Sequence, residues 1–135
     1  MIDKRKTLAG YRLETANDCM SSAKLEFDAG KYKASANRVY YAMFHAIRAV
    51  LALDGVDFKK HSAVISQFRQ SYIKTGIFDS KYSDTIKHMF NVRMDSDYED
   101  FYVISKDEVK EQIDEIIYFI SAVTAYITTQ KPKSS

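Results

Sequence analysis

The side chains best suited to chemistry stand in one largely apolar stretch, NRVYYAMFHAIRAVLAL, at positions 37–53. A helix places four of its polar residues on one face, because they recur at steps of four, four and three: Asn37, Tyr41, His45 and Arg48. An amide, a phenol, an imidazole and a guanidinium on one face offer hydrogen-bonding groups to a nucleotide-sized cleft or a dimer surface. The same groups, with Arg38 beside them, are also able to hydrogen-bond neighbouring helix ends or to reach water past the core. The sequence leaves both interpretations open.

A second set of groups begins at Arg93, in the segment RMDSDYEDFY. The planar fork of donors on an arginine suits a phosphate, whose charge it stabilises. The ordinary alternatives are that Arg93 caps helix carbonyls or pairs with a nearby carboxylate such as that of Asp97. The acidic residues after Arg93 disfavour an accessible phosphate site unless Mg²⁺ or pairing within the chain offsets their charge.

His61, in KKHSA at the start of a predicted helix, lies among donors and positive charges that favour anions. Its simpler interpretation is a local cap or a surface residue. The three histidines, at positions 45, 61 and 88, do not have the i, i+4 spacing of helical zinc ligands. The sequence also lacks a phosphate-binding glycine loop and the HExxH, CxxC and GxSxG signatures. We therefore expect neither a metal site nor a cofactor.

The chain of 135 residues is long enough for one domain with a single core. Hydrophobic residues make up 46% and charged residues 28%, which is ordinary for a soluble globular protein. One proline and four glycines, together with many good helix formers, favour helices over strands. The net charge of +2 does not exclude RNA as a partner and does not by itself predict it.

Cys19 is the only cysteine, so an internal disulfide is impossible and a reducing compartment is indicated. The N-terminal segment MIDKRKTLAGYRLE lacks the apolar core of a signal peptide. Polar or charged residues at positions 38, 45, 48 and 54 interrupt the longest apolar run. No run therefore reaches the ~18 apolar residues of a membrane span. We expect a cytoplasmic protein with no membrane association.

Apolar periodicity predicts long helices at about 7–28, 32–53, 79–92 and from 105 onward, with a shorter one at about 61–74. Gly30 is expected to end the first helix in the left-handed conformation, and Ser105 with Glu108 to cap the last one. The polar segment 91–105 has no sustained helical period and is interpreted as a loop. The second helix is apolar around its whole circumference, which predicts a central helix surrounded by others.

The expected fold is all-α, an antiparallel four-helix up-and-down bundle with a short fifth helix. Residues 1–135 form a single domain in this interpretation, with a core at about 7–128 and a frayed basic tail at 129–135.

Three segments in a fixed order resemble the HEPN domain family: ASANRVYYAMFHAIRAVLAL, KKHSAVISQF and VRMDSDY, followed by an Ile-rich last helix. The similarity covers about residues 7–128, and its sequence motifs are more specific than a generic helical pattern. The resemblance implies a compact HEPN-like bundle that pairs as a homodimer. It also implies an operon partnership with a minimal nucleotidyltransferase, the two forming a toxin–antitoxin or related defence module. Many HEPN domains are metal-independent endoribonucleases whose active cleft forms across the dimer.

The ribonuclease branches of this family carry an arginine and a later histidine, with four to six residues between them. Arg93 matches the arginine, but the histidine positions hold Tyr98, Glu99 and Asp100. A tyrosine hydroxyl with a pKa near ~10 is a poor general base, whereas imidazole exchanges protons near neutral pH. Tyr98 is suited to orient a group or donate a hydrogen bond, not to replace histidine. Some partner nucleotidyltransferases adenylylate a tyrosine near this motif, and neither Tyr98 nor Tyr102 stands where that fuller motif would place it.

Three functions are consistent with these residues. The first is a HEPN-type dimeric module, the HEPN half of a HEPN/nucleotidyltransferase pair, whose polar cleft binds a nucleotide, RNA or the partner. The second is a divergent metal-independent endoribonuclease that uses Arg93 for phosphate stabilisation and a base such as His45 or His61. The third is a structural helical adaptor in which every polar residue serves stability. The candidate catalytic residues are Arg93 and Tyr98, and the candidate ligand-binding residues are Asn37, Tyr41, His45, Arg48, His61 and Asp97.

Overall fold

The computed structural model describes residues 3–98 and 103–130, with only the backbone described for residues 95–98. Every regular element in these ranges is a helix, which confirms the expected all-α class. The elements are α1 (Lys4–Asp28), α2 (Tyr32–Ala52), α3 (His61–Phe68), the π-helical turn η1 (Arg69–Ile73) that continues α3, α4 (Lys81–Tyr98) and α5 (Lys106–Thr129). None of them combines the length and the apolar content that crossing a bilayer requires.

Two of the predicted helix ends are confirmed by their local geometry. Gly30 follows α1 with a φ of 77°, a conformation that a residue without a Cβ adopts at little cost. Ser105 caps α5, and its Oγ accepts a hydrogen bond from the backbone N–H of Glu108 at 3.1 Å. These two residues therefore fix where the first helix ends and where the last one begins.

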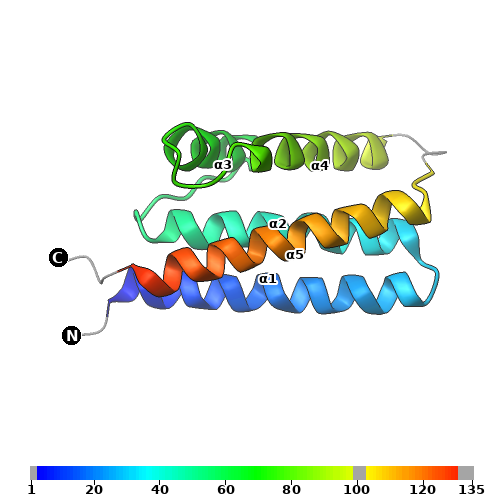
Figure 1. The fold of residues 1–135 in the computed structure, drawn as a ribbon, viewed down its shortest axis with the longest axis horizontal. Coiled ribbons are helices and arrows are strands. Elements are labelled where there is room, and N and C mark those ends of the chain that lie inside the picture. Colours follow the sequence, from blue (N-terminus) through cyan, green and yellow to red (C-terminus); the bar gives the residue numbers. More distant parts are fainter. Residues whose placement is uncertain (1–2, 99–102, 131–135) are drawn as a thin grey trace.

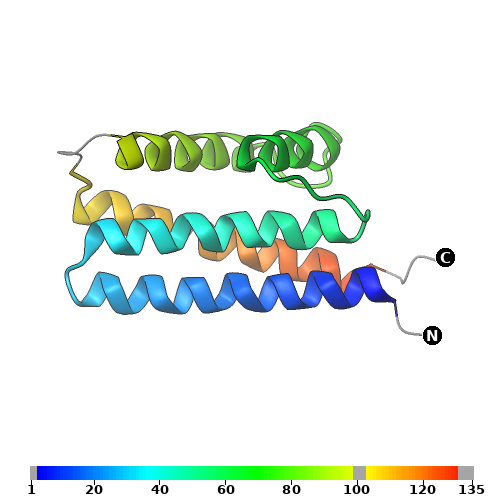
Figure 2. The same cartoon turned by 180° about the vertical axis from the view of Figure 1, so that it is seen from behind.

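The helices are layered around α2. α1 and α2 run antiparallel side by side, α5 crosses one side of this pair, and α3 and α4 lie along the edge of α2 opposite α1 (Figure 1). Seen from behind, α2 lies in front of α5 and no helix crosses its near side (Figure 2). The largest buried side chains of α2, which fill the core between these layers, are Val39, Tyr40, Met43, Phe44, Ile47, Val50 and Leu51.

The prediction that α2 is central is confirmed, but the expectation that it is covered all round is wrong. Asn37 is exposed, and Tyr41, His45 and Arg48 are half-buried. We call the side of α2 that carries these four residues the open face. The sequence pattern overestimated burial because tyrosine, histidine and arginine pack an apolar body against the core while their polar ends reach water.

The loop predicted to begin at residue 91 is also wrong for its first part. α4 continues to Tyr98, so Arg93 lies inside a helix and not in the segment that follows it. The polarity of the segment was misleading, because the outer side of a surface helix needs no apolar period. Residues 91–98 contain neither glycine nor proline, and nothing in them interrupts the helix.

Small side chains allow α1 and α2 to pack closely. Three fully buried alanines recur at seven-residue steps along α1: Ala9, Ala16 and Ala23. The facing side of α2 carries Ser35, whose Oγ donates a hydrogen bond to the carbonyl oxygen of Ala23 at 2.7 Å. Ala42 and Ala49 follow Ser35 at steps of seven and are fully buried as well. Because no bulky group separates the two helices, side chains of α1 reach α2 directly.

We predict that Ala16→Leu lowers the free energy of unfolding by about 1–3 kcal/mol, because the larger side chain has no space between α1 and α2. Ala125→Leu, at an exposed position of α5, is the matched control and should change stability little. Urea denaturation followed by circular dichroism measures both variants. Equal unfolding midpoints would show that the α1–α2 contact is not tightly packed.

Candidate functional site

Arg93 reaches from α4 to two adjacent tyrosines of α2. Its Nη2 donates a hydrogen bond to the Tyr41 hydroxyl at 2.9 Å. Its guanidinium carbon lies 4.8 Å from the centroid of the Tyr40 ring and 5.1 Å from that of Tyr41. A cation over the face of an aromatic ring is attracted by the negative charge density there. The guanidinium is therefore held in one place at the edge of the open face.

His61 joins the same group from the start of α3. Its Nδ1 shares a hydrogen bond with the Tyr40 hydroxyl at 3.0 Å, and its ring stacks on Phe44 with the centroids 3.9 Å apart. The Tyr41 ring meets it edge-on at 6.1 Å. Partial burial, and then the charges of Arg93 and Arg48, lower the pKa of His61. The imidazole is therefore mostly neutral at neutral pH, the form in which one ring nitrogen accepts a proton.

His45 and Arg48 continue the open face along α2. The His45 ring stacks on Tyr41 with the centroids 6.2 Å apart. Burial is the main cause that lowers the pKa of His45, and the charge of Arg48 lowers it further. Arg48 donates from Nη2 to Oδ2 of Asp57 at 3.1 Å, and Arg12 of α1 donates to the same oxygen at 3.0 Å. The open face therefore has a cationic group at each end and aromatic rings between them.

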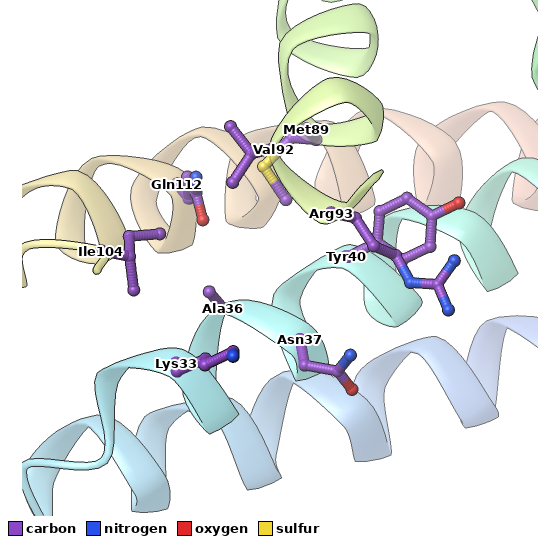
Figure 3. Close-up of a pocket in the computed structure, with 9 residues that line it drawn as sticks. All are labelled: Lys33, Ala36, Asn37, Tyr40, Met89, Val92, Arg93, Ile104 and Gln112. Carbon is purple, nitrogen blue, oxygen red and sulfur yellow. The ribbon is translucent and has the colours of Figure 1, made fainter. Parts of the chain in front are cut away.

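Asn37 lies at the rim of a narrow crevice between α2, α4 and α5, where Arg93 extends over Tyr40 (Figure 3). The crevice leaves about 20 Å³ in which the centre of a water molecule can lie, which is room for a single water and not for a base. Gln112 of α5 lines it as well and is 4% exposed. This crevice is therefore too small to admit a nucleotide.

The remaining two candidates, Asp97 and Tyr98, belong to the last turn of α4. Their backbone is helical, four and five positions after Arg93, and their side chains lie outside the described part of the structure. At 100° per residue, position 98 stands about 140° around the helix from position 93. The structure thus unites Arg93 with Tyr41 and His61, whereas the predictions for Asp97 and Tyr98 concern side chains outside its described part.

Three residues of this region were not singled out by the sequence pattern. Tyr40 was counted as core, and it is 1% exposed, yet its ring and its hydroxyl connect Arg93 to His61. Arg12 and Asp57 belong to different elements from Arg48, and no local spacing relates them to it. One sign of the role of Tyr40 was present in the sequence, since Tyr40 is adjacent to Tyr41, which was already a candidate binding residue.

Metal ligands do not gather anywhere in the part of the chain that the structure describes. Within residues 3–98 and 103–130, no three histidine, cysteine, aspartate or glutamate side chains come close enough together to hold a metal ion. The chemistry available to the open face in these ranges is that of guanidinium, imidazole, phenol and amide groups.

Comparison with known families identifies the fold. The sequence model of the HEPN domain matches residues 9–126, which is most of the chain. The chain belongs to the HEPN family. The all-α bundle described above, with α2 at its centre, is thus the fold of a HEPN domain.

Related proteins occur in Thermotoga maritima and Methanocaldococcus jannaschii. A UPF0332 protein of Thermotoga maritima is 30% identical over 131 residues, which cover 97% of this chain and 98% of that protein. A protein of Methanocaldococcus jannaschii named "Putative toxin MJ0605" is 30% identical over 106 residues, 78% of this chain and 75% of the relative. A second protein of that archaeon with a toxin name, MJ0142, is 25% identical over 118 residues, 87% of this chain and 80% of the relative.

The lowered pKa values of His45 and His61 predict how stability depends on pH. The unfolded chain binds protons more readily at these positions than the folded protein does. The contribution of these two histidines to the free energy of unfolding should therefore be complete at pH values above 6.5, the ordinary histidine pKa. It should decrease as the pH drops below 6.5. Urea denaturation at a series of pH values between about 7.5 and about 5.5 measures this loss.

The double variant His45→Gln/His61→Gln should flatten that pH dependence, because it removes both groups that take up the protons. His88→Gln, at an exposed position of α4, is the matched control. An unchanged slope in the double variant would mean that other groups cause the loss of stability.

Proposed function

We propose that this HEPN protein acts as a dimeric module, the HEPN half of a HEPN/nucleotidyltransferase toxin–antitoxin or defence pair. In this proposal the open face of α2, together with His61 and Arg93, binds a nucleotide, RNA or the partner nucleotidyltransferase. The observation that carries it is the position of Arg93, which is held against Tyr40 and Tyr41 at the one side of α2 that no helix covers.

The family and the names of the relatives support the toxin part of the proposal. Two relatives that cover most of this chain carry toxin names. The pairing with a minimal nucleotidyltransferase follows from what the HEPN resemblance implies. A gene for a small nucleotidyltransferase next to the gene for this chain is the arrangement that this proposal expects.

The charges on the open face support binding of an anion. Arg12 and Arg48 share the one carboxylate of Asp57, so this end of the face has an excess of positive charge among the described side chains. The pKa values of His45 and His61 on this face are lowered, mainly by partial burial and further by the charges of the neighbouring arginines. A surplus of fixed positive charge on an exposed surface attracts phosphate groups from solution. A purely structural adaptor has no need of such a surplus.

A second candidate function, cleavage of RNA, is favoured by the position of His61. The family histidine after Arg93 is replaced by Tyr98, but α3 brings a mostly neutral imidazole to the Arg93 group. When His61 donates its Nδ1–H to the Tyr40 hydroxyl, the lone pair on Nε2 is left for a substrate proton.

The reaction in this proposal is an intramolecular transfer. His61 removes the proton from a ribose 2′-hydroxyl, and the 2′-oxygen attacks the adjacent phosphorus. The bond from phosphorus to the 5′-oxygen breaks, which leaves a 2′,3′-cyclic phosphate. The leaving 5′-oxygen takes the proton back from the imidazolium or from water. Arg93 stabilises the additional negative charge on the phosphate oxygens.

We predict that the purified protein cleaves at least one RNA of a broad panel, and that Arg93→Ala and His61→Gln each reduce the rate by about 100-fold or more. Lys110→Ala, which removes an exposed lysine paired with Asp114 on α5, is the folded control. Gel analysis of end-labelled RNA, with the cyclic phosphate identified by mass spectrometry, measures the reaction. If no RNA of the panel is cut, the second candidate function is excluded and the binding module stands.

The dimer in the first proposal has its own test. Sedimentation velocity at micromolar concentration should give the mass of a dimer, about twice the 15.5 kDa of the chain. Tyr41→Glu adds a charge to the open face and should shift the protein to the monomer if this face adjoins the dimer contact. A wild-type protein that sediments as a monomer contradicts a cleft shared between subunits.

A further inference from the structure

Two arginines from different helices converge on one carboxylate oxygen beside the open face. Arg12 of α1 and Arg48 of α2 each donate from Nη2 to Oδ2 of Asp57, at 3.0 and 3.1 Å. The side chains of Arg12 and Arg48 are 12% and 27% exposed, whereas that of Asp57 is 48% exposed. The oxygen that receives both donors is therefore carried by the most accessible of the three residues.

The charges at this point are not balanced. Two guanidiniums face one carboxylate, so a net positive charge is left between α1 and α2. Burial lowers the pKa of Arg12, and repulsion from Arg48 lowers it further. Partial burial acts in the opposite direction on Asp57, but its hydrogen bond and ion pair with Arg48 hold the pKa of its carboxyl below the ordinary value. A structural ion pair needs only one arginine, and exposed pairs stabilise a fold little.

The two guanidiniums are positioned without help from Asp57. Arg12 also donates from Nη1 to the backbone carbonyl oxygen of Arg48 at 3.2 Å, a contact that the close packing of α1 on α2 allows. The guanidinium carbon of Arg48 lies 6.0 Å from the centroid of the Phe44 ring. Donors fixed in this way remain in place for another oxyanion when the carboxylate moves away.

The loop that carries Asp57 is likewise held by other contacts. Gly55 turns the chain with a φ of 70°, and its backbone N–H donates to the carbonyl oxygen of Ala52 at 3.0 Å. The backbone N–H of Val56 donates to Leu51 at 3.2 Å, and the Tyr72 hydroxyl donates to the Asp54 carboxylate. Removal of the charge of Asp57 therefore leaves the loop anchored at both its beginning and its contact with η1.

We propose that Arg12 and Arg48 form a second phosphate-binding subsite of the open face, which the carboxylate of Asp57 occupies in the absence of ligand. The ligand is a single strand of RNA, with one phosphate at Arg93 and a later phosphate at the Arg12–Arg48 pair. The inference rests on the proposed function for the phosphate at Arg93.

The spacing of the two subsites suits a strand and not a single phosphate group. Tyr41, which holds Arg93, and Arg48 are seven residues apart on α2, a distance of about 10 Å along the helix. The half-buried rings of Tyr41 and His45 lie between them, and exposed aromatic faces are surfaces on which unpaired bases stack. Asp57 competes with the later phosphate, so a short RNA reaches only the Arg93 subsite and a longer one has to displace the carboxylate.

The test compares a dinucleotide with an octanucleotide of 2′-O-methyl uridine, which cannot be cleaved at the 2′-oxygen. Fluorescence anisotropy measures the dissociation constants for wild type, Asp57→Asn, Arg48→Gln, Arg12→Gln and Arg93→Ala at several salt concentrations. Lys110→Ala is the control, and thermal unfolding shows whether each variant is folded. Two separate arginine variants keep the test decisive if one of them fails to fold.

We expect Asp57→Asn to bind the octanucleotide about threefold more tightly, because the internal competitor is gone, and to bind the dinucleotide as wild type does. Arg48→Gln or Arg12→Gln should weaken octanucleotide binding alone. Each should also reduce the slope of log K against log salt concentration by ~0.7, the value for one lost phosphate contact on a single strand.

Four results would overturn the proposal. If the Asp57→Asn variant binds the octanucleotide no better than wild type does, the carboxylate does not compete with the RNA phosphate. Equal losses for both lengths in the arginine variants would show that the pair does not form a separate subsite. If wild type binds neither oligonucleotide, the proposed function fails together with this inference. If binding depends on Arg93 and not on Arg12 or Arg48, only this inference fails.

Discussion

The guanidinium of Arg93 lies against two neighbouring tyrosine rings of α2, and this contact connects the outer helix α4 to the centre of the domain. Tyr40 and Tyr41 make different contacts. Tyr41 accepts the hydrogen bond from Arg93, while Tyr40 supports the guanidinium with its ring and contacts His61 with its hydroxyl. One aromatic doublet thereby sets the distance between α2, α3 and α4. The positions of Arg93 and His61 beside the open face follow from that spacing.

Arg93 has an imidazole near it that comes from another helix. His61 stands at the start of α3 and shares a hydrogen bond with the hydroxyl of Tyr40, whose ring supports Arg93. The lowered pKa of His61 has its main cause in burial and a further cause in Arg93 itself. The same guanidinium that suits a phosphate therefore also keeps the neighbouring imidazole neutral, so the two groups are chemically matched although they come from different helices.

Much of the fold was predictable from the sequence because it depends on local patterns. The apolar stripe of each helix, the left-handed Gly30 and the Ser105 cap are properties of a few adjacent residues, and the structure confirms them. The open side of α2 was not predictable, since apolar counts cannot tell a covered tyrosine from a half-exposed one. The extension of α4 past Arg93 was missed because a polar segment was taken for a loop. The ion pair between Arg12 and Asp57 depends on how α1 packs on α2, and residue spacing along the chain does not predict that packing.

The small side chains between α1 and α2 have a consequence for motion. Helices that approach closely over alanine and serine, and that share the Ser35 hydrogen bond, have few rotamers to rearrange and move as one stiff body. α4, in contrast, meets the open face through the long, jointed side chain of Arg93. We therefore expect α1 and α2 to move together in the thermal motion of the domain, so that the gap between Arg12 and Arg48 stays constant.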